Sequence, residues 1–284
     1  MPAEPPVQSP RTLDEAYRLL AEGDGWRPMA GGTDLLVQIT GELGSLPERV
    51  LDIWALDELR GINLQDGALA LGALTTYTDI RRSELCQRLV PALVDAAATI
   101  GAAQIQNRGT IGGNVVNASP AGDTLPVLLA TDAELVLGSA RGERTVPATD
   151  FWPAYRQTAR APDEVLLRVL IPLPAGRLVR FRKVGTRRAQ AISKVVMALS
   201  WRADAGVWRD VRLGLGSVAD RPIRARQTES VLEGAAPRRE TADHAAATAA
   251  QEIRPIDDVR STADYRRVVT ARVLHRLLRE AGGW

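Results

Sequence analysis

Small, polar and conformationally free residues gather in one stretch of the sequence, from Gly109 to Asp123. The stretch holds four glycines, two asparagines, two hydroxyl side chains and one carboxylate, and apolar segments of helical character flank it. This composition is poor for a core and typical of a loop laid against a polar ligand, because glycine lets a backbone approach closely. We interpret it as the middle of a nucleotide-binding site.

A second glycine pair occurs earlier, in the run Gly31-Gly32-Thr33-Asp34. It lies between a predicted strand, 26–30, and a predicted helix, 35–39, an order that presents backbone N–H groups and a helix N-terminus to phosphate. An ordinary tight turn, with Thr33 or Asp34 as the helix cap, is the alternative, because the run lacks the GxGxxG and Walker-type patterns.

The two glycine loops are more informative together than either is alone. A dinucleotide has a pyrophosphate, two sugars and two ring systems, so it needs two or more loops lined by backbone. Asn114 can offer an amide, Thr110 a hydroxyl, and Asp123 an acceptor for a ribose hydroxyl. The structural alternative is that Asn114 and Asp123 only cap turns.

The sequence offers few residues for metal binding or for acid–base and nucleophilic catalysis. One cysteine, Cys86, and two histidines, His244 and His275, are too few for a structural zinc site, an iron–sulfur cluster or a disulfide framework, so no metal site is predicted. Both histidines lie in C-terminal helical sequence, so no Ser-His-Asp or Cys-His constellation is available and no catalytic residue is predicted. Redox work in this chain must then be a cofactor's.

The elements around the loops predict an α+β protein of three parts. We expect strands at 49–53 and 164–171, hairpins at 62–71 and 133–146, and helices at 13–22, 77–89, 91–100 and 125–130. Beyond residue 176, alternating runs at 180–184, 194–202 and 207–214 predict an antiparallel sheet, covered by amphipathic helices at 242–253 and 263–281. The predicted division is 1–55 and 56–176 as two lobes, and 177–284 as the sheet-plus-helix domain.

Charge and hydropathy exclude several function classes. The net charge is +2 with a pI near 9.0, and the two signs are interspersed, which argues against a nucleic-acid partner. The first residues do not read as a signal peptide, and no apolar run reaches the roughly 18 residues that a membrane helix needs. We therefore expect a cytoplasmic protein without a membrane span.

Three segments carry a resemblance to a known family. Ala30-Gly31-Gly32-Thr33-Asp34-Leu35, the run from Asn107 to Asn114, and Ala118-Ser119-Pro120-Ala121-Gly122-Asp123 resemble the FAD-binding medium subunit of molybdenum hydroxylases, the xanthine dehydrogenase and carbon monoxide dehydrogenase family. The run from Phe181 to Arg188 with Ile192-Ser193-Lys194-Val195 is similar to that family's C-terminal domain. The resemblance spans essentially the whole chain, and it implies a two-lobed FAD-binding domain of the p-cresol methylhydroxylase type before the C-terminal domain.

The resemblance also implies roles for individual residues. The first loop would wrap the FAD pyrophosphate, the second would continue the cradle, and Asp123 would accept from a ribose hydroxyl. Leu166 matches a position whose backbone touches the isoalloxazine, Lys183 matches a basic position near the flavin, and Ile100 stands where some relatives place an aromatic ring. The cofactor-binding residues so predicted are Ala30, Gly31, Gly32, Thr33, Asp34, Leu35, Ile100, Thr110, Gly112, Gly113, Asn114, Asp123, Leu166 and Lys183.

The function implied by the resemblance is that of an electron-transfer subunit in an oxidoreductase. A large partner would carry the molybdopterin centre and a small partner two [2Fe-2S] clusters, in a heterotrimer or its dimer, and the flavin here would pass electrons to NAD or another acceptor. The run 184–193 favours a xanthine dehydrogenase-type complex. A self-sufficient flavin oxidase or reductase, or a non-catalytic nucleotide-binding regulatory protein, remains the alternative.

Overall fold

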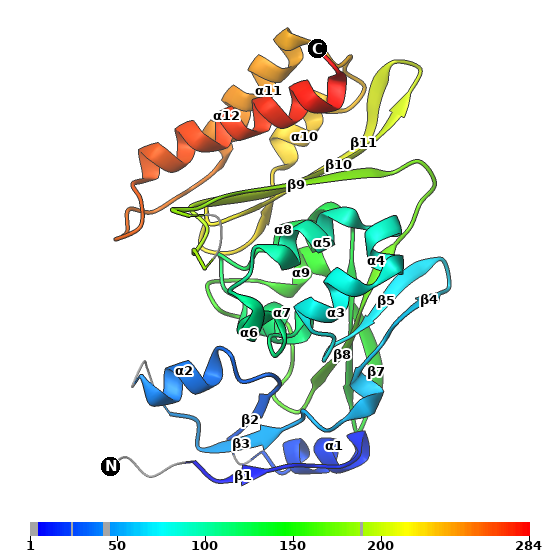
Figure 1. Ribbon diagram of the computed structural model, residues 1–284, viewed down its shortest axis with the longest axis vertical. Helices are drawn as coiled ribbons and strands as arrows, with labels where there is room; N and C mark the ends of the chain where they lie inside the picture. Colours follow the sequence, from blue (N-terminus) through cyan, green and yellow to red (C-terminus); the bar gives the residue numbers. More distant parts are fainter. Residues whose placement is uncertain (1–4, 24, 42–45, 188–189) are drawn as a thin grey trace.

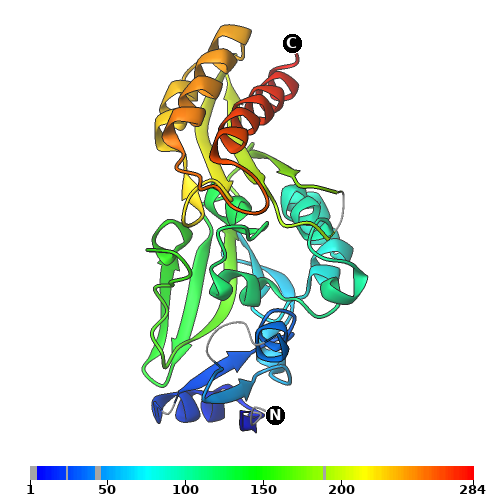
Figure 2. The same cartoon turned by 90° about the vertical axis from the view of Figure 1, so that its left-hand side faces the viewer.

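The computed structural model describes residues 5–23, 25–41, 46–187 and 190–284. Its elements form three tiers, each built on its own sheet, with the first described residues in the lowest tier and the C-terminus in the highest (Figure 1). A view turned by 90° shows the same stack from the side (Figure 2). The predicted α+β class, with an antiparallel C-terminal sheet under helices, is confirmed.

The lowest tier is a small parallel sheet with the strand order β1-β3-β2. Its strands and helices are β1 (Val7–Gln8), α1 (Leu13–Ala21), β2 (Trp26–Met29), α2 (Leu35–Thr40) and β3 (Arg49–Asp52). Helix α1 begins where the Thr12 hydroxyl accepts a hydrogen bond from the Glu15 N–H group. Because β2 and β3 run parallel, the segments that follow them meet at one edge of the sheet, facing the middle tier.

The middle tier is an antiparallel sheet with the order β4-β5-β8-β6-β7. Its strands are β4 (Ile62–Gln65), β5 (Ala68–Gly72), β6 (Glu134–Ser139), β7 (Gly142–Pro147) and β8 (Val165–Pro172), preceded by the short helix η1 (Asp57–Leu59). Its helices are α3 (Tyr77–Arg82), α4 (Glu84–Leu89), α5 (Pro91–Ala98), α6 (Ala103–Gln106), α7 (Ile111–Asn117), α8 (Leu125–Ala130) and α9 (Ala148–Phe151). The largest buried apolar cluster joins these helices, except α6, to one face of the sheet.

The highest tier is an antiparallel sheet with the order β12-β11-β10-β9, which lies between helices of the middle tier and the C-terminal helices (Figure 1). Its elements are β9 (Leu178–Val184), β10 (Val195–Asp204), β11 (Val207–Gly216), β12 (Ile223–Arg224), α10 (Arg226–Leu232), α11 (Arg239–Glu252) and α12 (Ala263–Gly282). Strand β10 is buried from Val195 to Trp201 and exposed at its last three residues, because apolar side chains pack on both faces of its first part. In the described part of the chain, no helix is both long enough and apolar enough to cross a membrane.

Two predicted elements were wrong. The helix predicted over 77–89 is two helices, because Ser83 is extended and its hydroxyl caps α4 by accepting from the Cys86 N–H group. The stretch from Gly109 to Asp123 is not all loop, since Ile111–Asn117 forms α7. Ile111 and Val115 are fully buried, and this tertiary packing outweighs the poor helix propensity of the glycine pair.

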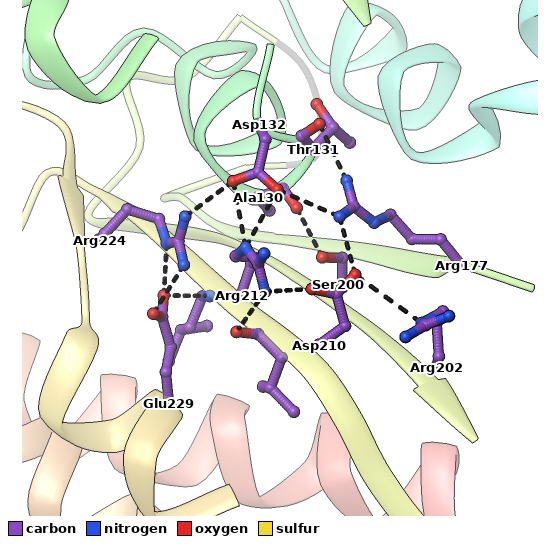
Figure 3. Close-up of polar contacts among 12 residues, drawn as sticks. Ala130, Thr131, Asp132, Arg177, Ser200, Arg202, Asp210, Arg212, Arg224 and Glu229 are labelled. Atoms are coloured by element: carbon purple, nitrogen blue, oxygen red, sulfur yellow. Dashed lines mark hydrogen bonds and ion pairs between the residues drawn. The ribbon is translucent and has the colours of Figure 1, made fainter. Parts of the chain in front are cut away.

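Ion pairs fasten the highest tier to the middle one (Figure 3). Asp132, in the turn between α8 and β6, accepts hydrogen bonds from Arg177, Arg212 and Arg224 at 3.0–3.1 Å. Asp210 shares two of these arginines. The network places one acidic turn of the middle tier against basic side chains that come from the C-terminal part of the chain.

Candidate functional site

A cavity of about 470 Å³ lies between the lowest and middle tiers. Both predicted glycine loops line it, although they are almost 80 positions apart in the sequence. Of the predicted cofactor-binding residues, all except Asp123 and Lys183 line this cavity, namely Ala30, Gly31, Gly32, Thr33, Asp34, Leu35, Ile100, Thr110, Gly112, Gly113, Asn114 and Leu166. Its volume falls in the range typical of small-molecule and cofactor sites.

The first glycine loop, 30–35, presents unpaired backbone donors to the cavity. None of the N–H groups of residues 31–35 donates a hydrogen bond to another described residue. Gly32 has φ +73°, a conformation that favours glycine, and it turns the chain from β2 into α2. Consecutive free N–H groups in such a turn form a concave binding site for an anion.

The second glycine loop enters the cavity as the first turn of α7. The Thr110 hydroxyl accepts a hydrogen bond from the Gly113 N–H group at 3.0 Å and so begins the helix. The two glycines that follow have different reasons to lack a side chain. A Cβ at Gly112 would lie 2.6 Å from the carbonyl oxygen of Ala73, whereas at Gly113 it would meet only the Thr110 hydroxyl, at 3.0 Å. Gly112 therefore serves packing, and Gly113 keeps the cavity open.

Asn114 and Tyr77 add polar groups to the cavity wall. The Asn114 side-chain oxygen accepts a hydrogen bond from the Thr124 hydroxyl, and this leaves its NH₂ group without an acceptor among the described residues. Tyr77 is 3% exposed, and burial raises the pKa of its hydroxyl, with further contributions from Asp123 and Asp34. The phenol is therefore neutral and can donate a hydrogen bond.

Three arginines that sequence reasoning missed also line the cavity: Arg27, Arg156 and Arg160. Burial lowers the pKa of Arg160, and its guanidinium donates to three backbone carbonyl groups, of Ala161, Pro162 and Glu164. Glu164 also lines the cavity, and Arg144 holds its pKa below the usual range. Three arginines thus stand against two carboxylates in the lining, Asp34 and Glu164, and Glu164 is already paired with Arg144, so the wall has a surplus of positive charge.

Asp123 and Lys183 lie outside the cavity lining and pair with each other. Their exposed side-chain fractions are 6% and 8%. The Lys183 ammonium group also donates to the carbonyl oxygen of Thr99 at 3.1 Å. Burial raises the pKa of the Asp123 carboxyl, and Lys183 opposes that shift. Ribose binding by Asp123 and flavin contact by Lys183 stay predictions, because here the two groups serve to join β9 to the middle tier.

The missed cavity residues come from segments without a recognisable motif. Arg27 is a single charge in a four-residue strand, and Tyr77 opens a helix. Arg156 and Arg160 belong to an irregular segment after α9. The one signal in the sequence was the excess of arginine over lysine among the cations, and that signal does not say which arginines meet at one place.

Comparison with known proteins identifies the family. Residues 3–174 match the model described as the FAD binding domain in molybdopterin dehydrogenase, and residues 180–281 match the CO dehydrogenase flavoprotein C-terminal domain. The medium chain of glyceraldehyde dehydrogenase from Sulfolobus acidocaldarius is 34% identical over 91% of this chain and 91% of its own length. The xanthine dehydrogenase FAD-binding subunit of Escherichia coli O157:H7 is 32% identical, over 96% of this chain and 95% of its own.

The fold agrees with the sequence match. A chain of the carbon monoxide dehydrogenase of Hydrogenophaga pseudoflava superposes with a TM-score of 0.93 at 30% identity, over 97% of this chain and 96% of that one. The chain therefore belongs to the family of FAD-binding medium subunits of molybdenum hydroxylases, the oxidoreductases that include xanthine and carbon monoxide dehydrogenases.

Proposed function

We propose that this chain holds FAD in the cavity between its lowest and middle tiers, with the pyrophosphate on the N–H groups of residues 31–35. The run of unpaired donors is the observation that carries the proposal. A phosphate oxygen accepts such hydrogen bonds without any side chain, and the two glycines let it come close.

The rest of the cavity fits the same ligand. Gly113 leaves space where any larger residue would project, and Asn114 offers its amide to a sugar or ring. Arg27, Arg156 and Arg160 balance the two negative charges of the pyrophosphate. Leu166 and Ile100 supply apolar contact of the kind that an isoalloxazine ring needs.

The flavin would supply the redox chemistry, since it can exchange electrons one or two at a time. The chain's own residues bind and orient it and set the charge around it. We propose that electrons arrive from two [2Fe-2S] clusters on a small partner subunit and leave to NAD or another acceptor. One cysteine in 284 residues cannot ligate such clusters, which supports placing them on another chain.

We further propose that a large partner carries the molybdopterin centre, in a heterotrimer or its dimer, and that the complex is of the xanthine dehydrogenase type. Support for the substrate class is the match to the Escherichia coli subunit of that name and the run 184–193, of which Arg188 and Ala189 lie outside the described residues. The cytoplasmic location expected from the sequence stays a prediction. Purification of the complex should yield molybdenum, iron and flavin together with oxidation of a purine, and oxidation of a purine by this chain alone would contradict the subunit role.

The FAD site is tested by Gly113→Val. The valine side chain would project into the cavity, where its Cβ would meet only the Thr110 hydroxyl, so we expect FAD affinity to fall by about a hundredfold or more while the protein stays folded. Titration of the full chain with FAD, followed by flavin fluorescence, measures the affinity, and circular dichroism checks the fold.

Ala247→Val is the control, since it introduces the same side chain on a helix, at an exposed position of α11 that does not line the cavity. It should bind FAD as the wild type does. Wild-type affinity in the Gly113→Val variant would refute the placement of the cofactor.

A further inference from the structure

We propose that Arg108 is a positioning residue. By stacking its guanidinium on Trp54, it holds the two glycine loops in a fixed position relative to each other. This inference rests on the proposed FAD site. The two halves of the cradle belong to different tiers, and Arg108 keeps them at a fixed distance from each other. Arg108 does not line the cavity, so its part is to place other groups.

The backbone of Arg108 lies directly against the first loop. A Cβ at Gly31 would overlap the carbonyl oxygen of Arg108, and it would lie 3.2 Å from the amide nitrogen of Gly109. Only glycine at position 31 allows this approach. The residue that precedes the second loop therefore touches the loop that carries the free N–H groups.

The side chain of Arg108 makes a second contact with the same tier. Its guanidinium carbon lies 3.8 Å from the ring centroid of Trp54, well within the distance of a cation–π interaction. Trp54 follows β3, and the N–H group of Ile53 donates to the carbonyl of Met29, so the ring stands beside the end of β2 where the first loop begins. Among the described residues, the Arg108 guanidinium has no hydrogen bond or ion pair, so its polar interaction there is the one with the Trp54 ring.

The effect of Arg108 passes to the second loop through three consecutive residues. The carbonyl of Gly109 accepts from the Tyr77 N–H group at 3.2 Å, and Thr110 then caps α7 through Gly113. With its backbone on Gly31 and its guanidinium on Trp54, Arg108 fixes where Thr110 and Gly113 stand relative to the N–H groups of residues 31–35. Loss of the stack frees the two loops to separate.

The test measures FAD dissociation constants for the full chain carrying Arg108→Ala. We expect the dissociation constant to rise about fivefold, the equivalent of a cation–π contact of about 1 kcal/mol. Trp54→Leu should have the same effect, Trp54→Phe a smaller one because it keeps an aromatic face, and the double variant Arg108→Ala/Trp54→Leu no more than either single change.

Arg60→Ala is the control. Arg60 also lies against Trp54, with its guanidinium carbon 4.4 Å from the ring centroid, but it donates to the Trp54 carbonyl, and among the described residues no hydrogen bond or ion pair joins it to the second loop. It should lower stability without changing FAD affinity. An unchanged dissociation constant in Arg108→Ala, or an equal loss in Arg60→Ala, would overturn the inference. Failure of the wild-type chain to bind FAD would overturn the proposed function instead.

Discussion

The Lys183–Asp123 pair shows how much a single buried contact does in this molecule. Lys183 belongs to β9 of the highest tier, and Asp123 precedes α8 of the middle tier. The lysine also holds the carbonyl of Thr99, the residue before Ile100 in the cavity wall. The pair therefore joins two tiers and supports one side of the cavity, at the cost of removing two charges from water.

Lys183→Met should destabilise the protein in a way that depends on pH. Without the ammonium group, burial alone acts on Asp123, and its pKa in the folded state rises further above the unfolded value. A raised folded-state pKa means that the folded protein binds the proton more tightly, so stability falls as pH rises. We expect a loss of about 3 kcal/mol near pH 8 and a smaller loss near pH 5.

Urea denaturation of wild type and variant at the two pH values measures this difference. The double variant Lys183→Met/Asp123→Asn is the control, because it has no carboxyl to titrate and its stability relative to wild type should vary less with pH. Equal losses for Lys183→Met at both pH values would show that Asp123 gains no proton in the variant.

Sequence reasoning found residues that belong to a motif and missed those that do not. The glycines at 31, 32, 112 and 113 and their neighbours could be predicted to meet, because backbone-lined loops have a composition of their own. The positions of Arg160 and Tyr77 could not be predicted in this way. They depend on how an irregular segment and a short helix pack in three dimensions. The Asp123–Lys183 pair joins positions 60 apart, and nothing local in either segment predicts that contact.

At the scale of elements, α7 explains why the second glycine stretch was predicted as a loop. Gly112 and Gly113 have poor helix propensity, and the helix forms because Thr110 caps it and because Ile111 and Val115 are buried. The Trp152 indole N–H group donates to the Val115 carbonyl, which places α7 further. Propensity alone could not have shown this, since the deciding contacts come from other elements.

Strands with clear alternation and turn signals, such as β4 and β5 about Asp66-Gly67, could be predicted from local sequence.

Thr110→Ala tests the capping of α7. Removing the hydroxyl leaves the Gly113 N–H group without its acceptor, and an N-cap of this kind is worth about 1 kcal/mol. We expect that loss in the free energy of unfolding, together with weaker FAD binding, because the first turn of α7 lines the cavity. Thr110→Ser keeps the hydroxyl and should restore most of both quantities. If Thr110→Ser behaved like Thr110→Ala in denaturation and FAD titration, the methyl group and not the cap would be responsible.

At the scale of the whole molecule, the cavity lies between two tiers and the third tier supports it from above. The highest tier contributes no residue to the described cavity lining, yet β9, β10 and β11 pack against α5 and α8 (Figure 1). Gly214 of β11 approaches α8 so closely that a Cβ there would overlap the backbone of Pro126. The C-terminal domain thus acts on the site through packing and through the ion pairs of Figure 3.

Asp132→Asn should weaken the junction between the two upper tiers. Arg177 and Arg224 have side chains only 8% exposed, and each keeps one other carboxylate partner, so the loss is that of charge-assisted hydrogen bonds and not of all pairing. Because Asp132 is itself 36% exposed, solvent screens part of the effect, and we expect a loss of about 1–2 kcal/mol and a melting temperature lower by about 2–6 °C. The difference from wild type should shrink in high salt.

Asp220→Asn, at the more exposed pair with Arg221, is the control and should change stability by less than about 0.5 kcal/mol. Calorimetry at low and high salt decides the matter, since equal melting temperatures for wild type and Asp132→Asn would mean that apolar packing alone joins the tiers.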